Sequence, residues 1–191
     1  MDYKNGRNQF RKIKWVLIIL EKFYRLLPLK ARKRKLENKR YKRGKLGLAL
    51  RYVLLKSIAK SIGDNVSIHQ GCFLLNPEGL EIGENVSIHP MCYIDASGGI
   101  KIGDNVSIAH GVTILSSTHT YIDKEIPIKY QDIVLLRTEI ENDCWIGAKA
   151  TIIGGVNIGT GCVIGATSVV THNIENNSVV VGVPGKKIKS R

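Results

Sequence analysis

The sequence predicts a mainly β solenoid preceded by a basic helical extension, and three of its features support this fold class. The phrase Ile-Gly-Asp-Asn-Val-Ser-Ile begins at residues 62 and 102, and a variant with Glu for Asp begins at residue 82. An aliphatic residue then recurs at every sixth position from 140 to 170, and Lys and Arg are concentrated before the first repeat. A period of six fits neither a helix nor simple strand alternation, so it indicates triangular coils with three sides of six residues.

Each place in the six-residue repeat has a preferred residue type. The first residue is aliphatic and the fifth is small or β-branched, so both are expected to point inward and to stack on the next coil, roughly 4.8 Å away. The second is often glycine, as at Gly63, Gly83 and Gly103, where we expect a tight corner. Since one coil cannot bury its own apolar face, stacked neighbours must stabilise each other. Segments 76–79 and 97–99 supply turn residues in the longer coils.

The four cysteines all occupy the fifth place of a repeat: Cys72, Cys92, Cys144 and Cys162. We therefore expect them to be small apolar fillers of the core rather than metal ligands or disulfide partners. No two are spaced as CxxC, and no metal site is expected. Four unpaired thiols without a recognisable secretion signal favour a reducing, cytoplasmic location.

The N-terminal third differs from the rest in charge and periodicity. Residues 1–61 hold 20 Lys and Arg against 3 Asp and Glu, whereas residues 62–191 hold 9 against 13. The extension is rich in Leu and lacks the repeat, so it is expected to be helical, with Pro28 ending or kinking the first helix. Its apolar run is too short to cross a membrane. Two roles stay open, a cap on the first coil or contact with an anionic inner-membrane surface; no nucleic-acid-binding motif accompanies the charge.

The repeat is interrupted once, between Ile114 and Ile140. About 20 residues, near 118–137, are expected to be extruded from the coil, and long excursions from compact domains are usually functional. His119 lies where the excursion starts. An imidazole titrates near neutral pH and can act as a general base, so His119 is the candidate catalytic residue.

Three motifs follow the interruption. Cys-Trp-Ile-Gly-Ala begins at residue 144, Val-Ile-Gly-Ala-Thr-Ser-Val-Val-Thr at 163, and Val-Gly-Val-Pro-Gly-Lys at 181. Together with the repeat, over residues 62–189, this set resembles the hexapeptide-repeat acyltransferases, in the branch of the galactoside, maltose, nodulation, capsule and exopolysaccharide O-acetyltransferases. The resemblance implies a left-handed parallel β-helix of about five coils over residues 62–191, with a C-terminal tail at 176–191. It also implies acetyl-CoA as co-substrate and a homotrimer.

The same resemblance implies roles for individual residues. A sugar hydroxyl would attack acetyl-CoA directly, with His119 as general base and the amide of Ala148 as oxyanion donor. The acetyl-CoA site would comprise Trp145, Ala148, Ala166, Thr171, His172, Lys186 and Lys189, with His172 standing where the family usually has Lys. A carboxylate or a backbone carbonyl should fix the tautomer of His119, and Glu139, Glu141 and Asp143 are candidates that the sequence does not rank.

The acceptor site is expected near His89, Asp95 and Ser97, although the sugar-binding motif of the galactoside enzymes is not kept there. That departure, with the basic extension, favours a capsule, exopolysaccharide or lipid-linked sugar as acceptor, at the inner membrane face. Two alternatives stay open. One is N-acetylation of an amino-sugar nucleotide; the other is a zinc enzyme or scaffold, suggested by outward positions of His69 and His110 together with His89.

Overall fold

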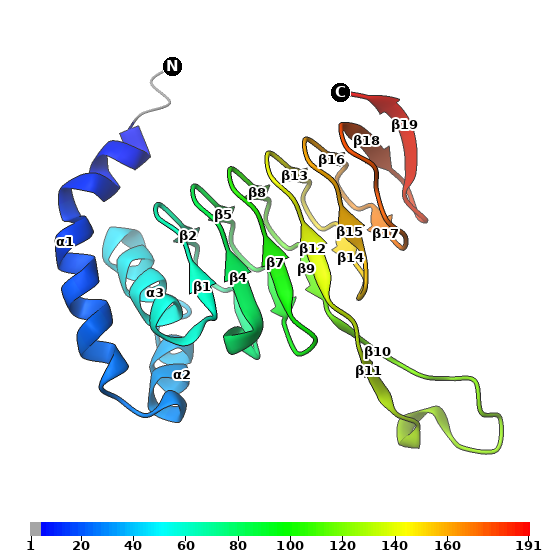
Figure 1. Ribbon diagram of the computed structural model, residues 1–191, viewed down its shortest axis with the longest axis horizontal. Helices are drawn as coiled ribbons and strands as arrows, with labels where there is room; N and C mark the ends of the chain where they lie inside the picture. Colours follow the sequence, from blue (N-terminus) through cyan, green and yellow to red (C-terminus); the bar gives the residue numbers. More distant parts are fainter. Residues whose placement is uncertain (1–4) are drawn as a thin grey trace.

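The computed structural model describes residues 5–191 and places three helices at one end of a long solenoid (Figure 1). The helices are α1 (Asn5–Arg25), α2 (Leu29–Asn38) and α3 (Gly44–Ile58). Pro28 stands at the start of α2, where a proline needs no backbone donor, and thus separates it from α1 as predicted. The expected fold class, a left-handed parallel β-helix after a helical extension, is confirmed.

Three sheets form the sides of the solenoid, and each coil contributes one strand to each side. Sheet A contains β1 (Ser61–Ile62), β4 (Leu80–Ile82), β7 (Ile100–Ile102), β12 (Thr138–Ile140) and β15 (Asn157–Ile158). Sheet B contains β2 (Ser67–Ile68), β5 (Ser87–Ile88), β8 (Ser107–Ile108), β13 (Trp145–Ile146), β16 (Val163–Ile164), β18 (Ser178–Val181) and β19 (Lys186–Ser190). Sheet C contains β3 (Phe73–Leu75), β6 (Tyr93–Asp95), β9 (Thr113–Leu115), β14 (Thr151–Ile152) and β17 (Val169–Val170). A 3₁₀ turn, η1 (Pro77–Gly79), leads from sheet C to sheet A in the first coil.

The repeat sets the register between coils. Ile62 pairs with Ile82, Ile82 with Ile102, and Ile102 with Ile140, so the extruded segment leaves the stacking of sheet A unbroken. The aliphatic first positions are buried along the axis. All four cysteines are buried and free, which confirms their predicted place in the core.

The second-position glycines have a different cause from the one expected. A Cβ at Gly63 would lie 2.6 Å from the carbonyl carbon of Gly83, so glycine is needed because successive coils approach closely. The left-handed backbone of this corner falls instead on Asn65, Asn85 and Asn105, with φ of 55°, 57° and 58°. Asparagine tolerates that conformation, and here its side chains also bond to each other from coil to coil, at 3.1 Å.

The helices close the N-terminal end of the solenoid. α3 packs on the first coil, and α1 packs on α3, where Phe10 meets the ring of Tyr52 edge-on at 5.4 Å. Arg51 of α3 is buried and donates to the carbonyl groups of Ile68, in the first coil, and Lys42, just before α3, each at 2.7 Å. The extension therefore caps the first coil of the solenoid. Within residues 5–191, no helix is long and apolar enough to cross a membrane.

The extruded segment is an arm that projects from the side of the solenoid (Figure 1). It leaves after β9 in sheet C and returns at β12 in sheet A. Its two strands, β10 (Ser117–His119) and β11 (Ile133–Leu135), pair antiparallel, and a short 3₁₀ helix, η2 (Ile128–Tyr130), lies near the tip. The expectation of an excursion at about 118–137 is met, with a paired hairpin at its base.

Candidate active site

Two buried hydroxyl groups hold the base of the arm. Ser116, before β10, donates from Oγ to the carbonyl of Asp95 at 2.7 Å and accepts the Gly98 N–H at 2.9 Å. Thr138, where the arm returns, donates to the carbonyl of Leu115 at 2.7 Å and accepts the Gly155 N–H at 3.1 Å. Both side chains are fully buried. They tie the exit and the return of the chain to neighbouring turns.

These two residues are absent from the set predicted from the sequence. The signal that could have revealed them is their place: a Ser and a Thr directly flank the interruption, where the arm leaves the core. Buried polar groups are usually hydrogen-bonded, so polar residues at core positions beside an excursion indicate an anchored hinge.

His119 is the last residue of β10 and lies opposite Ile133 of β11. The pairing continues one step further, since Thr120 donates its N–H to the Asp132 carbonyl at 2.9 Å. The backbone of His119 is thus held by the hairpin while its side chain is exposed. Among the hydrogen bonds of residues 5–191, none reaches its ring nitrogens, which leaves the ring open to a substrate or a partner.

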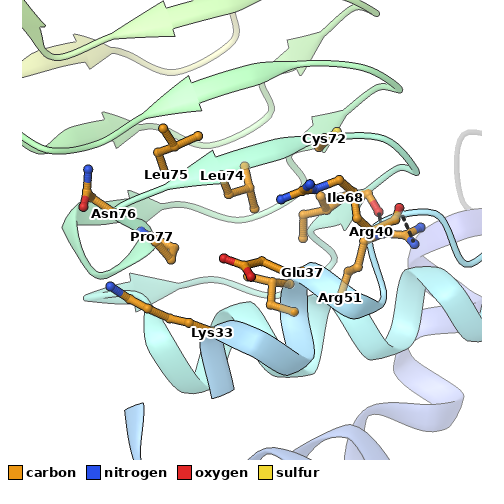
Figure 2. Close-up of a pocket in the computed structure, with 11 residues that line it drawn as sticks. Lys33, Glu37, Arg40, Arg51, Ile68, Cys72, Leu74, Leu75, Asn76 and Pro77 are labelled. Atoms are coloured by element: carbon orange, nitrogen blue, oxygen red, sulfur yellow. Dashed lines mark hydrogen bonds between the residues drawn. The ribbon is translucent and has the colours of Figure 1, made fainter. Parts of the chain in front are cut away.

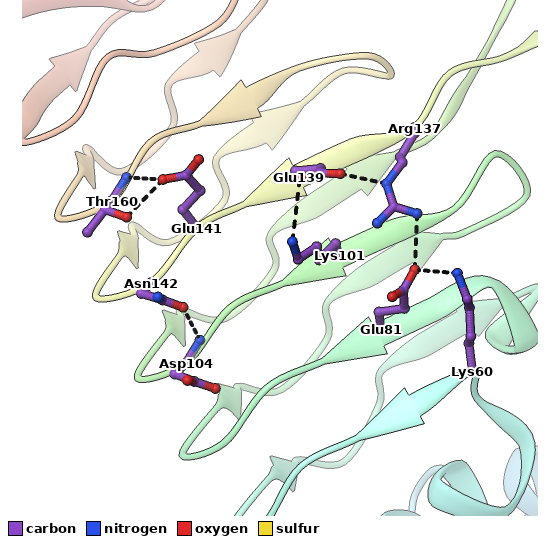
Figure 3. Close-up of polar contacts among 9 residues, drawn as sticks. All are labelled: Lys60, Glu81, Lys101, Asp104, Arg137, Glu139, Glu141, Asn142 and Thr160. Carbon is purple, nitrogen blue, oxygen red and sulfur yellow. Dashed lines mark hydrogen bonds and ion pairs between the residues drawn. The ribbon is translucent and has the colours of Figure 1, made fainter.

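The three carboxylates proposed to orient His119 are engaged elsewhere within the chain. Glu139 accepts from Arg137 at 2.6 Å, Glu141 from the hydroxyl of Thr160 at 2.8 Å, and Asp143 from Arg191 at 2.8 Å. Figure 3 shows the first two on the outer side of sheet A and its following turn. Within residues 5–191 none of the three is hydrogen-bonded to His119, because these side chains project from sheet A and the turn after it.

Glu139 belongs to a ladder of alternating charge that crosses the coils on sheet A (Figure 3). Arg137 bridges Glu139 and Glu81, and Glu81 also pairs with Lys60 at 2.9 Å. Hydrogen bonds from Lys60 and then Arg137 hold the pKa of the Glu81 carboxyl below its usual value. Because Arg137 directly precedes Thr138, the ladder also supports the return of the arm.

Ala148 and Ala166 lie in equivalent turns between sheets B and C, on consecutive coils. The carbonyl of Ala148 accepts the Thr167 N–H at 2.8 Å. Neither alanine donates its own N–H to an acceptor among residues 5–191, so both donors remain available to a ligand. Trp145 lies on β13, the strand of sheet B that directly precedes the turn of Ala148, and its side chain is exposed. This edge of the prism therefore offers small residues, free amides and an indole.

The other predicted cofactor residues lie elsewhere. Thr171 and His172 follow β17, in a turn between sheets C and A, with the hydroxyl 3.3 Å from the imidazole Nδ1. Lys186 and Lys189 are exposed on β19, which pairs antiparallel with β18 at the C-terminal end of sheet B. Their ammonium groups make no ion pair within residues 5–191.

The predicted acceptor residues are divided between two edges. Asp95 and Ser97 lie at the base of the arm, where the Asp95 carboxylate accepts from Asn76 at 3.0 Å and from the Ser97 N–H at 3.1 Å. His89 lies across sheet C, on the edge that carries Ala148 on a later coil. Its ring stacks on that of His69, with centroids 5.1 Å apart and planes at 5°. Burial lowers the pKa of His69, and the positive charges of His89 and Arg51 lower it further.

A separate pocket of about 280 Å³ opens between α2 and the first coil (Figure 2). Leu36, Leu74 and Pro77 contribute apolar surface, and Lys33 and Arg40 contribute charge. None of the predicted catalytic or cofactor residues lines it. In the described part of the chain, moreover, no group of three His, Cys, Asp or Glu side chains is placed to hold a metal ion.

Comparisons with known proteins match the solenoid. The family described as bacterial transferase hexapeptide (six repeats) matches residues 137–172, and the hexapeptide repeat of succinyl-transferase matches residues 79–116. The resemblance to hexapeptide-repeat acyltransferases is therefore confirmed.

Curated relatives align over short segments. A probable acetyltransferase of Mycobacterium tuberculosis is 41% identical over 73 residues, which is 38% of this chain and 24% of the relative. WbbJ of Escherichia coli, provisionally named as an O-acetyltransferase of lipopolysaccharide biosynthesis, is 49% identical over 45 residues, 24% of this chain and 23% of that protein. The matching segments thus span about a quarter of the length of these two relatives.

Solved structures align over much more of the chain. A maltose O-acetyltransferase from Clostridium difficile has a TM-score of 0.70 at 28% identity, covering 84% of both chains. A galactoside acetyltransferase in complex with coenzyme A has a TM-score of 0.72 at 27% identity, covering 84% of this chain and 78% of that one. AntD, an N-acyltransferase from Bacillus cereus in complex with dTDP and coenzyme A, has a TM-score of 0.61 at 28% identity, covering 69% and 73%.

Proposed function

We propose that this protein is an acetyl-CoA-dependent O-acetyltransferase acting on a hydroxyl of a sugar or polysaccharide precursor. The observation that supports it most is the arm, which is anchored by Ser116 and Thr138 and carries an exposed histidine at its base. The likeness to a maltose O-acetyltransferase over 84% of the chain supports the same reading.

In the proposed reaction, His119 removes the proton from the acceptor hydroxyl while the oxygen attacks the thioester carbon of acetyl-CoA. A tetrahedral oxyanion forms, the C–S bond breaks, and coenzyme A leaves as a thiol that takes up the proton from the imidazolium. A general base contributes roughly 10²- to 10⁴-fold to such a step. The unbonded N–H of Ala148 is the proposed oxyanion donor, a role worth roughly 10²- to 10³-fold where it has been measured.

The residues present fit acetyl-CoA. Small side chains at Ala148 and Ala166 leave room for the pantetheine arm beside two free amides. Lys186 and Lys189 would meet phosphate groups as point charges, and Trp145 would bound the acetyl pocket. Thr171 and His172 would contact the cofactor from the next edge. When bound, acetyl-CoA supplies the activated acyl group.

A homotrimer is part of the proposal. The arm exposes several large apolar side chains, among them Tyr121 and Ile122 at 73% and 84%, and such surface usually marks a protein interface. A neighbouring copy would cover the arm. It would also offer a group to orient His119, which the chain's own carboxylates do not provide.

The acceptor proposed is a capsule, exopolysaccharide or lipid-linked sugar unit, handled on the cytoplasmic side of the inner membrane. The similarity to WbbJ supports a glycan of the cell envelope. Within this proposal, residues 1–61 form the basic extension and residues 62–191 the acyltransferase domain. Asp95, Ser97 and His89 remain the proposed acceptor contacts.

A second candidate is N-acetylation of an amino-sugar nucleotide. It is favoured by one observation, the likeness to AntD, whose structure contains dTDP and coenzyme A. An amine acceptor would also need a base, so the position of His119 serves either reaction. The identity of the acceptor separates the two.

The deciding experiment measures thiol release from acetyl-CoA with a panel of hydroxyl and amino sugars. We expect release to depend on a hydroxyl sugar and to fall by about 10²-fold or more in His119→Ala. His110→Ala is the matched control, because His110 is exposed on the solenoid. Full activity in His119→Ala would refute the assigned base, and failure to bind acetyl-CoA would refute the acetyltransferase itself. Preference for amino sugars would favour the second candidate.

A further inference from the structure

Helix α1 has two apolar faces, and only one of them is covered. Phe10, Leu17 and Tyr24 pack toward the core. On the opposite side stands the outer face of α1, which we define as Trp15, Ile19, Phe23 and, just after the helix, Leu26. Residues spaced four, four and three apart fall on one side of a helix. These side chains are 58–81% exposed.

The charges around the outer face have a single sign. Arg11, Lys12 and Lys22 are exposed beside it. The only carboxylate of α1, Glu21, is buried and paired with Arg25. The surface that this helix presents to solvent therefore combines an apolar stripe with charges that are all positive.

The position of α1 leaves this face accessible within one chain. Figure 1 shows α1 lying across the end of the solenoid, with α3 between it and the first coil. The outer face points away from the solenoid. The neighbouring helix α2 adds exposed cations at Lys30, Arg34 and Lys35, which extend the basic surface at the same end of the molecule.

We propose that the outer face of α1 docks onto an anionic lipid bilayer. A helix with an aromatic and aliphatic stripe between Lys and Arg residues lies in the plane of the membrane interface. Tryptophan favours the headgroup level, and each basic residue near an anionic surface adds attraction. A second copy docking face to face would bring like charges together and so be opposed.

Docking in this way would hold the end of the solenoid on the membrane with the coils projecting away from it. If the proposed glycan acetylation is correct, the enzyme would work close to lipid-linked acceptors. The docking itself does not depend on the acetyl transfer, so the two can fail separately.

The test is co-sedimentation of the full chain with vesicles of phosphatidylcholine alone or mixed with phosphatidylglycerol. We expect at least tenfold stronger binding to the anionic vesicles, weakened by salt as charges are screened. Trp15→Ser combined with Phe23→Ser should reduce binding at least tenfold. The control is Val183→Ser with Ile188→Ser at the C-terminal end of the solenoid, where apolar side chains that are 73% and 58% exposed are removed.

The contribution of charge to vesicle binding is tested separately. Lys12→Gln with Lys22→Gln should weaken binding to the anionic vesicles, and the control is Lys124→Gln with Lys129→Gln on the arm. Trp145→Phe leaves Trp15 as the only tryptophan, since the chain has 2, and its emission should shift to the blue with anionic vesicles. Absence of binding would overturn the proposal, as would an equal loss of binding in the control variants. The proposal would also be overturned if the Trp15 and Phe23 substitutions dissociated an oligomer, as measured by light scattering. The outer face of α1 would then join copies of this chain.

Discussion

Replacing Thr138 by Val would remove the hydroxyl that anchors the return of the arm while keeping the shape of the side chain. Two hydrogen bonds are lost, the one to the Leu115 carbonyl at 2.7 Å and the one from the Gly155 N–H at 3.1 Å. Thr138 is fully buried, so water cannot replace either bond. A buried polar group left unpaired costs about 1–3 kcal/mol, and two such groups predict a loss of about 2–6 kcal/mol.

For a chain of this length, that loss corresponds to a fall in Tm of roughly 4–24 °C. Thermal unfolding by circular dichroism measures it. The matched control is Thr113→Val in β9, a half-buried strand residue whose hydroxyl makes no hydrogen bond among residues 5–191, and its Tm should stay close to that of the wild type. Both changes keep a β-branched side chain, so strand propensity is not altered.

The local consequence is checked at lower temperature by trypsin digestion. Lys124 and Lys129 are exposed on the arm, and loosening its base should speed cleavage there. Acetyl transfer should also fall, because a general base displaced by about 1 Å can lose roughly 10²-fold in rate. A Thr138→Val protein with unchanged Tm, cleavage and activity would show that the buried hydroxyl does not hold the arm.

Three further predictions concern the buried thiols of the core, the contacts between coils and the stacked histidine pair. The Cys144 thiol should resist modification in the native state, because it is buried and burial raises its pKa to about 11; rapid labelling of Cys144 by a disulfide reagent before denaturation would contradict this. Gly103→Ala should destabilise by about 1–3 kcal/mol in urea unfolding, as for other overpacked sites, since its Cβ would lie 2.8 Å from the Asn142 nitrogen; no loss would refute the close approach of coils. Because the pKa of His69 is lowered, the unfolded chain binds more protons below its ordinary pKa near 6.5, so the folded state should lose stability as pH falls below that value. His69→Gln should lessen the loss between pH 7.5 and 5.5, and an equal effect of His110→Gln would count against this assignment.

The repeat made most of the solenoid predictable. A residue that recurs every six positions must face the axis in every coil, so the inward stacking of Ile62, Ile82 and Ile102 and the burial of Cys72 follow from spacing alone. The interruption after Ile114 likewise located the arm and His119. These are properties of local order along the chain, which the sequence displays directly.

Other features depend on residues that meet only after folding. Ser116 bonds to the Asp95 carbonyl, and Thr138 to that of Leu115, across separations of 21 and 23 positions. Glycine is required at position 63 because a Cβ there would lie 2.6 Å from the carbonyl carbon of Gly83 in the next coil. The left-handed backbone conformation falls instead on Asn65. The repeat does not reveal these contacts, because each depends on how closely particular groups approach once the coils have stacked.

The sequence by itself thus determined the solenoid, its inward residues, the place of the arm and the helical nature of the basic extension. Tertiary structure decided how the arm is anchored, which carboxylates are already paired, and which side of α1 stays uncovered. The reason is physical: a repeat states which residues are equivalent from coil to coil, whereas hydrogen bonds, close approaches and exposure depend on distances that exist only once the coils and helices have packed.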